Sequence, residues 1–189
     1  MINKTEFNRM RKELRDYDAK RELLIKQARV VLKDAKSMIF SIQRDSLTQA
    51  DTTLKKLLKE KSSLDKIAKP NQLKEGSYSE ACQEFVEAIV LFEYMKNKPI
   101  PKANSLKVST EDYLMGIADV AGELVRIAIA KSIKGKFKEV EKIKEDIAEV
   151  WGEMLKFDFR NSHLRRKFDS IKYNLNKLED IVYDIKMKK

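Results

Sequence analysis

The chain has 189 residues, of which 40 are Lys or Arg and 30 are Asp or Glu, so its formal net charge is +10. Only 5 Gly and 3 Pro interrupt it, too few for the many tight turns of an all-β sandwich or an α/β fold. A single Cys and a single His exclude an intramolecular disulfide, a zinc finger and a His-pair metal site.

The sequence also lacks the patterns that direct a chain into a membrane or onto a nucleotide. No apolar run approaches the ~20 residues that span a bilayer, and no Gly-rich phosphate loop is present. Residues 1–18 carry acids and lack the apolar segment of a signal peptide. We therefore expect a cytoplasmic protein without a membrane partner, and its basic charge favours a polyanionic ligand.

The positive charge is distributed unevenly. Residues 1–69 carry +8 and residues 131–189 carry +5, whereas residues 70–130 carry −3. The acidic and apolar middle of a basic protein is therefore the region that most needs an explanation.

The first 69 residues contain neither Gly nor Pro. Apolar residues recur at steps of three and four from Phe7 to Ile42, which predicts a long amphipathic helix. Arg21 interrupts this series, either as a rim position or as a charge that faces an interior channel. A second helix is expected over about residues 46–68, ended by Pro70.

The middle of the chain predicts two apolar helices. After a loop over residues 70–76, Ser77 and Glu80 match a capping box that opens a helix to about residue 96. Prolines break the chain again before Ser109, which with Asp112 offers the N-cap of a helix to about residue 132.

The C-terminal part predicts two more helices. A charged helix is expected over about residues 136–157, and a last helix, capped by Asn161 or Ser162, carries an apolar seam over residues 164–185. Six to seven helices with short connectors predict an all-α bundle in a single domain over residues 1–189. The two long seams exceed what one small bundle buries, which indicates oligomerisation.

Four carboxylates stand out on the apolar middle helices. Glu84 and Glu87 are adjacent on one helical face at i and i+3, and Asp119 and Glu123 are adjacent at i and i+4. Such acids are costly to bury unless they reach solvent, pair with a base such as Arg126, or hold a hard metal ion together. Spacing alone leaves these three alternatives open, although the absence of a Glu-x-x-His pair argues against a ferritin-like di-iron site.

Two glycines accompany the second acidic pair. Gly116 and Gly122 flank Asp119 and are expected to permit a close approach of neighbouring helices.

The two acidic segments resemble a known family. Residues 83–95 read QEFVEAIVLFEYM and residues 113–129 read YLMGIADVAGELVRIAI. Both resemble the translin superfamily, and within it the branch of translin-associated factor X (TRAX). Residues 162–186 are similar to the closing helix of both branches, and residues 18–40 also fit. The chain is similar to a short member of prokaryotic or archaeal type, without the basic nuclear-targeting tails of eukaryotic members.

This resemblance implies a translin-like helical bundle that assembles into hollow octamers and binds RNA or single-stranded nucleic acid. TRAX-type subunits are metal-dependent endoribonucleases, whereas translin subunits bind RNA without the full acidic site. The TRAX acids correspond to Glu84, Glu87, Asp119 and Glu123, which would be both catalytic and metal-binding. They would hold Mg²⁺ or Mn²⁺, and activated water would attack phosphorus.

Three functions follow as hypotheses. The first is a homo-octameric endoribonuclease that acts on single-stranded RNA or accessible duplex RNA, with single-stranded DNA as a possible ligand. The second is a translin-like assembly that binds single-stranded RNA or DNA without catalysis, and the third is a helical scaffold for partner helices. The candidate RNA-binding residues, each of which could instead lie on a solvated or salt-bridged face, are Arg11, Arg15, Arg21, Lys26, Arg29, Arg165, Arg166 and Lys167.

The remaining aromatic and nucleophilic residues are assigned structural roles. We expect Cys82 to be a buried small hydrophobe and His163 to be a loop or cap residue. The aromatic residues expected in the core, rather than stacked on bases, are Tyr17, Tyr94, Tyr113, Trp151 and Tyr173.

Overall fold

A computed structural model describes residues 2–71, 73, 75–160 and 162–187. The described residues form seven α-helices and no strand, as the sparse Gly and Pro predicted. In chain order the helices are α1 Lys4–Gln43, α2 Leu47–Ala68, α3 Gly76–Met95, α4 Ala103–Leu106, α5 Thr110–Ile133, α6 Phe137–Met154 and α7 His163–Met187.

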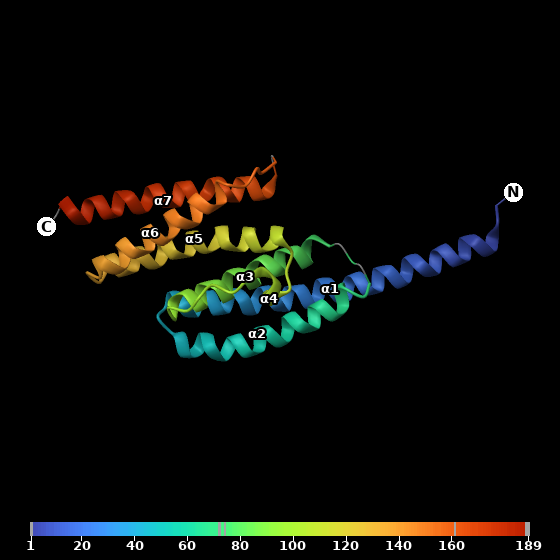
Figure 1. The fold of residues 1–189 in the computed structure, drawn as a ribbon. Coiled ribbons are helices and arrows are strands. Elements are labelled where there is room, and N and C mark those ends of the chain that lie inside the picture. Colours follow the sequence, from blue (N-terminus) through green and yellow to red (C-terminus); the bar gives the residue numbers. More distant parts are fainter. Residues whose placement is uncertain (1, 72, 74, 161, 188–189) are drawn as a thin grey trace.

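The helices form an elongated bundle in which α3 and α5 are central (Figure 1). Helix α3 packs against α1 and α2 on one side and against α5 on the other, and α5 packs in turn against α6 and α7. The short α4 lies in the connection between α3 and α5. The two acidic helices are therefore neighbours in the interior. Among the described residues, no helix is long and apolar enough to cross a membrane.

The first part of α1 projects beyond the rest of the bundle (Figure 1). From Leu24 to Ile42 the predicted apolar positions are buried. Before this point the same series is exposed, with between 43% and 64% of each residue accessible at Phe7, Met10, Leu14 and Tyr17. The amphipathic pattern predicted the helix correctly, but among the described residues its apolar series is buried only from Leu24 onward.

The predicted helix starts were confirmed at α2 and α5 and wrong at α3. Ser46 and Ser109 occupy N-cap positions, and the Ser109 Oγ accepts a hydrogen bond from the Asp112 amide at 3.0 Å. Helix α3 instead begins at Gly76, because Glu75 is the last extended residue before it. Ser77 therefore lies inside the first turn, and its buried Oγ has no hydrogen-bond partner among the described residues.

The C-terminal helices differ from prediction in small ways. Helix α6 ends at Met154 rather than near residue 157. Ser162 precedes α7 and its Oγ accepts a hydrogen bond from the Arg165 amide at 3.3 Å, whereas the other candidate cap, Asn161, lies outside the described residues. The four-residue α4 follows two prolines and was not predicted, because so short a helix carries no periodic signal.

Gly116 sets the distance between the two central helices. A Cβ added there would lie 2.7 Å from the Val86 Cβ and 2.8 Å from the Gln83 carbonyl oxygen, so α3 and α5 could not pack as they do. This confirms the predicted role of Gly116. Gly122 does not share it, since a Cβ there would meet only the Asn174 Nδ2, at an ordinary 3.6 Å.

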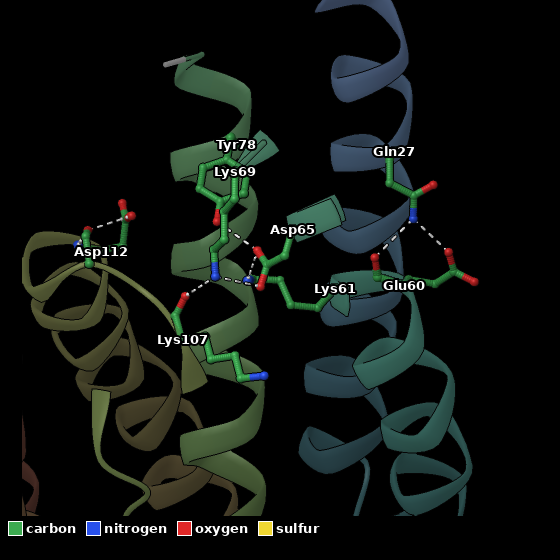
Figure 2. Close-up of polar contacts among 9 residues, drawn as sticks. Gln27, Glu60, Lys61, Asp65, Lys69, Tyr78, Lys107 and Asp112 are labelled. Atoms are coloured by element: carbon green, nitrogen blue, oxygen red, sulfur yellow. Dashed lines mark hydrogen bonds and ion pairs between the residues drawn. The ribbon is translucent and has the colours of Figure 1, made fainter. Parts of the chain in front are cut away.

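A buried ionic cluster joins α2 to α3 (Figure 2). Its members are Lys61, Asp65, Lys69 and Tyr78, and we call it the Lys61 cluster. Lys61 is only 3% exposed and its Nζ lies 2.6 Å from the Asp65 Oδ1, to which the Tyr78 hydroxyl also donates at 2.8 Å. Lys69 approaches the other Asp65 oxygen at 3.3 Å. Each charge in this cluster is therefore matched by an opposite charge or a hydrogen bond.

Candidate functional site

The four acids predicted as a site line a single cavity. This acidic cavity has a volume of about 370 Å³ and lies between α3, α5 and α7. Its lining consists of Glu84, Glu87, Ala118, Asp119, Gly122, Glu123, Lys167, Ser170 and Asn174. The two pairs, distant in sequence, thus share one solvent-accessible pocket.

Helical geometry explains this convergence. The acids of each pair are one turn apart and project from the same face of α3 or α5. Gly116 holds these helices together one turn before Asp119. Gly122 contributes no side chain to the wall that faces Asn174 of α7, and so leaves room for the cavity.

Two of the acids pair with lysines from other helices. The Glu84 Oε1 lies 3.4 Å from the Nζ of Lys36 on α1. The Asp119 Oδ2 is bound by the Nζ of Lys167 on α7. Burial raises the pKa of Glu84 above its usual value, with the nearby charge of Asp119 adding to the shift and Lys36 opposing it.

Glu123 is held by two partners. Its Oε2 accepts a hydrogen bond from the Nε2 of Gln43 on α1, and its Oε1 lies 3.2 Å from the Nη1 of Arg126. The pairing with Arg126 that the i, i+3 spacing allowed is therefore present.

Glu87 differs from the other three acids. It is only 7% exposed, and its side chain forms no hydrogen bond or ion pair with any residue that the structure describes. Burial, together with the negative charges of Asp119, Glu84 and Glu123, raises the pKa of Glu87 to about 8. Any cation that enters the cavity stabilises the ionised form of this carboxyl group.

The chemistry of the donors fits a hard divalent cation, although the side chains do not converge. Among the described residues, no three His, Cys, Asp or Glu side chains are placed to hold a metal ion together. The reason is that three of the acids turn toward their own partners. Four carboxylates around one cavity nevertheless supply the oxygen ligands that Mg²⁺ and Mn²⁺ prefer. Glu84, Glu87, Asp119 and Glu123 are the residues that would hold such an ion.

Comparison with protein families supports this arrangement of helices. The model of the Translin family matches residues 19–189. The chain belongs to the Translin family. It is 31% identical over 172 residues to an uncharacterized protein of Methanocaldococcus jannaschii, a match that covers 87% of this chain and 75% of that protein. It is 32% identical over 78 residues to translin of Gallus gallus, covering 41% of this chain and 34% of that translin. The match thus spans about a third of that translin.

Solved structures confirm the translin-like bundle. The Translin-family chain superposes on apo-NeC3PO with a TM-score of 0.88 at 28% identity, covering 97% of both chains. It superposes on AfC3PO in complex with duplex RNA with a TM-score of 0.85 at 26% identity, covering 97% of this chain and 98% of that one. The all-α fold and the family predicted from the sequence are therefore correct.

The basic cluster at the start of α7 is divided among three environments. Arg165 pairs with Asp169 at 3.1 Å and lies over the ring of Phe168, and Arg166 is exposed. Lys167 alone faces the acidic cavity of this Translin-family chain. The three residues therefore differ in their surroundings, and their role in RNA binding stays a prediction.

The candidate basic residues of α1 lie outside the cavity. Arg21 pairs with Glu75 at 3.1 Å, which agrees with the rim interpretation. Arg11 and Arg15 lie on the projecting part of α1 and contact neighbours on their own helix. Lys26 and Arg29 are exposed further along. Their role in RNA binding stays a prediction.

Several polar residues that contact the acids or line the cavity with them were missed by sequence reasoning. Lys36 and Gln43 lie seven residues apart on one face of α1, and Ser170 and Asn174 follow Lys167 on one face of α7. Single polar residues at helical spacing do not distinguish a site from a solvated face. Only the packing of α1 and α7 against the acidic helices identifies them.

The structural assignments were mostly correct. Cys82 is fully buried, and burial raises the pKa of its thiol to about 11. His163 is the exposed first residue of α7. Two tyrosines were wrongly placed in the core, since Tyr17 is 45% exposed and Tyr173 is 72% exposed. Tyr94, Tyr113 and Trp151 pack against the core while partly exposed.

Proposed function

We propose that this Translin-family chain is a TRAX-like, metal-dependent endoribonuclease that works as a homo-oligomer, with the octamer as the expected assembly. The observation that carries the proposal is the state of Glu87. Its side chain is only 7% exposed, lines the acidic cavity and has the charges of three other carboxylates around it. Perturbed acids of this kind in a cavity characterise catalytic sites, because stability alone selects against them.

The residues of the cavity have distinct roles in this proposal. Glu84, Glu87, Asp119 and Glu123 hold one or two Mg²⁺ or Mn²⁺ ions. When bound, a divalent cation activates water and neutralises charge on the phosphodiester. Gly122 keeps the wall between α5 and α7 open, so that a phosphate group has access to the acids.

RNA is the substrate class that the charges and the relatives support. The flanking segments of the chain carry +8 and +5, and AfC3PO has been solved in complex with duplex RNA. Lys and Arg on the outer helices would neutralise phosphates, which makes binding sensitive to salt. The exposed apolar stripe on the projecting part of α1 supports association with further copies of the chain.

The test is a cleavage time course with labelled RNA, in Mn²⁺, in Mg²⁺ and in EDTA, combined with a mass measurement in solution. Single-stranded RNA, duplex RNA and single-stranded DNA are compared as substrates. We expect cleavage of RNA only with a divalent ion, and a mass that is a multiple of the 22.1 kDa chain. Cleavage that persists in EDTA would contradict the proposal.

The second candidate function is a non-catalytic assembly that binds single-stranded RNA or DNA. The ion pairs of Glu84, Asp119 and Glu123 favour it, because paired acids can serve structure alone. RNA binding without cleavage in either metal would select this alternative. Binding that does not change from low to high salt would count against both.

A further inference from the structure

Lys167 is the basic residue that lines the acidic cavity within the described chain. Its Nζ binds the Asp119 Oδ2 and lies 3.4 Å from the Gln83 Oε1. About 20% of its side chain is exposed, so the ammonium group is only partly hydrated. Its positive charge also opposes the rise in the pKa of both Glu84 and Glu87.

A buried hydrogen-bond network holds the ammonium group in this place. Gln83 is 8% exposed, and its Nε2 donates to the Ser79 Oγ at 3.0 Å and to the Asp112 Oδ1 at 3.3 Å. The amide oxygen of the same side chain is then the acceptor for Lys167. Asp112, which is labelled in Figure 2, is fixed in turn by the Ser109 Oγ at 2.7 Å. The network therefore extends from the start of α5 through α3 to α7.

The position of this ammonium group conflicts with metal binding. Lys167 occupies one of the two oxygens of Asp119, so a metal ion that binds this carboxylate through both oxygens competes directly with the lysine. Two cations in one cavity also repel each other, whereas either one alone relieves the repulsion among the acids. The lysine and the metal ion are therefore alternatives for the same carboxylate.

We propose that Lys167 is a tethered cation that neutralises the acidic cavity and is displaced from Asp119 when a divalent metal ion binds. This inference rests on the proposed function, since it takes the acids to be metal ligands. Lys167 is thus a positioning residue that weakens metal affinity and keeps the acidic helices together without metal. Gln83 provides the second acceptor that holds the lysine in the cavity.

The experiment measures the dissociation constant of Mn²⁺ by electron paramagnetic resonance of the free ion, on the full chain after treatment with EDTA. Lys167→Met keeps the aliphatic stem and removes the charge, and Lys167→Arg keeps the charge. Lys172→Met, an exposed lysine of α7, is the matched control. We expect Lys167→Met to bind Mn²⁺ more tightly by about 5- to 150-fold, with Lys167→Arg and Lys172→Met close to the parent.

Lys167→Gln provides a second neutral variant that can still donate a hydrogen bond to Asp119. Circular dichroism identifies which variants fold in EDTA, and the Mn²⁺ affinities of the folded variants are compared. Mn²⁺ affinity that stays unchanged or falls in both neutral variants would overturn the role of Lys167. If Glu87→Gln lowers Mn²⁺ affinity in the same series, the proposed function survives that result. If the parent protein shows no Mn²⁺ binding that Glu87→Gln weakens, both the role of Lys167 and the proposed function are overturned.

Discussion

Helix α3 faces buried charge on two of its sides, and the charge is matched differently on each side. Toward α2, Tyr78 contributes to the Lys61 cluster, in which Asp65 has two lysines and a hydroxyl group as partners. Toward α5 and α7, Glu87 shares the acidic cavity with three other carboxylates and a single lysine. The central residue of each place is buried, Lys61 at 3% and Glu87 at 7% exposure.

The pKa values show what this difference means. Burial by itself raises the pKa of Asp65, but hydrogen bonds from Lys61 and Tyr78 and the charge of Lys61 outweigh it, so the pKa lies below its usual value. In the acidic cavity, burial and repulsion act in the same direction and raise the pKa of Glu87 to about 8. A buried charge with partners of opposite charge, such as Asp65, serves the fold. Buried acids that repel one another, such as those around Glu87, cost stability and indicate a ligand.

The largest expected effect comes from removing the negative charge of Glu87. Glu87→Gln keeps the size of the side chain and imitates its neutral form, so we expect intact RNA binding and assembly. Cleavage should fall by about 10²–10³-fold, the loss typical of removing one group that stabilises the transition state. The measurement is the rate of labelled-RNA cleavage in Mn²⁺.

Glu80→Gln is the control for this change, because Glu80 is exposed two turns earlier on the same helix. Glu84→Ala should behave as Glu87→Gln does. Full cleavage by the Glu84→Ala/Glu87→Ala double variant would remove the acidic cavity from the mechanism.

The next largest effect comes from removing the ion pair between Lys61 and Asp65. Lys61→Met leaves Asp65 buried with fewer partners, which should lower the free energy of unfolding by about 3 kcal/mol. Urea denaturation at fixed protein concentration measures this loss, with the exposed Lys66→Met as the control on the same helix. Since Lys61 belongs to α2 and does not line the acidic cavity, metal affinity should not change. A stability equal to that of Lys66→Met would mean that the cluster contributes nothing to the fold.

The contact at Gly116 belongs to the acidic side, because it sets how closely α3 approaches α5. Gly116→Ala should destabilise the chain by about 2 kcal/mol, since the new methyl group meets Val86 and the backbone of Gln83. Gly122→Ala is the matched control and should stabilise α5 by up to about 1 kcal/mol. Thermal unfolding compares the two. If Gly116→Ala leaves the stability unchanged, α3 and α5 can separate at this contact without cost.

The smallest effect, taken per pH unit, is a dependence of stability on pH. The folded pKa of Glu87 lies above its unfolded value of 4.5, so the folded state binds the extra proton between pH 4.5 and about 8. In EDTA, stability should therefore fall across this range by about 1 kcal/mol per pH unit. Glu87→Gln should remove this slope, becoming more stable than the parent above pH 8 and equal to it near pH 4.5. The free energy of unfolding is measured with denaturant for both proteins. If it changes with pH in the same way in the parent and in Glu87→Gln, the raised pKa of Glu87 is contradicted.

Much of the fold was accessible from sequence because its signals are local. The series from Phe7 to Ile42 predicted α1, and Ser109 predicted the start of α5. Errors occurred where local rules competed, as at Ser77, where an extended Glu75 starts the helix earlier than the capping box suggested. The short α4 lacked any periodic pattern.

The candidate site was predicted only in part for the same reason. Glu84 and Glu87, and likewise Asp119 and Glu123, are neighbours on their own helices, so spacing identified each pair. Spacing could not identify Gln43 or Lys36 from α1, which lie some 40 residues or more away in the chain yet bind the acids. It also grouped Lys167 with two surface arginines, although only the lysine faces the cavity.

The sequence by itself determined that the chain is helical, where most helices begin and end, and which acids lie together on each helix. These properties depend on periodicity, caps and breakers within a few residues. Only the tertiary structure decided that the two acidic pairs face one cavity, that Glu87 is the buried acid of the four, and that Lys167 is the cation lining the cavity with them. These properties depend on how α3, α5 and α7 pack, because burial and the charges of neighbouring helices set the electrostatic state of a side chain.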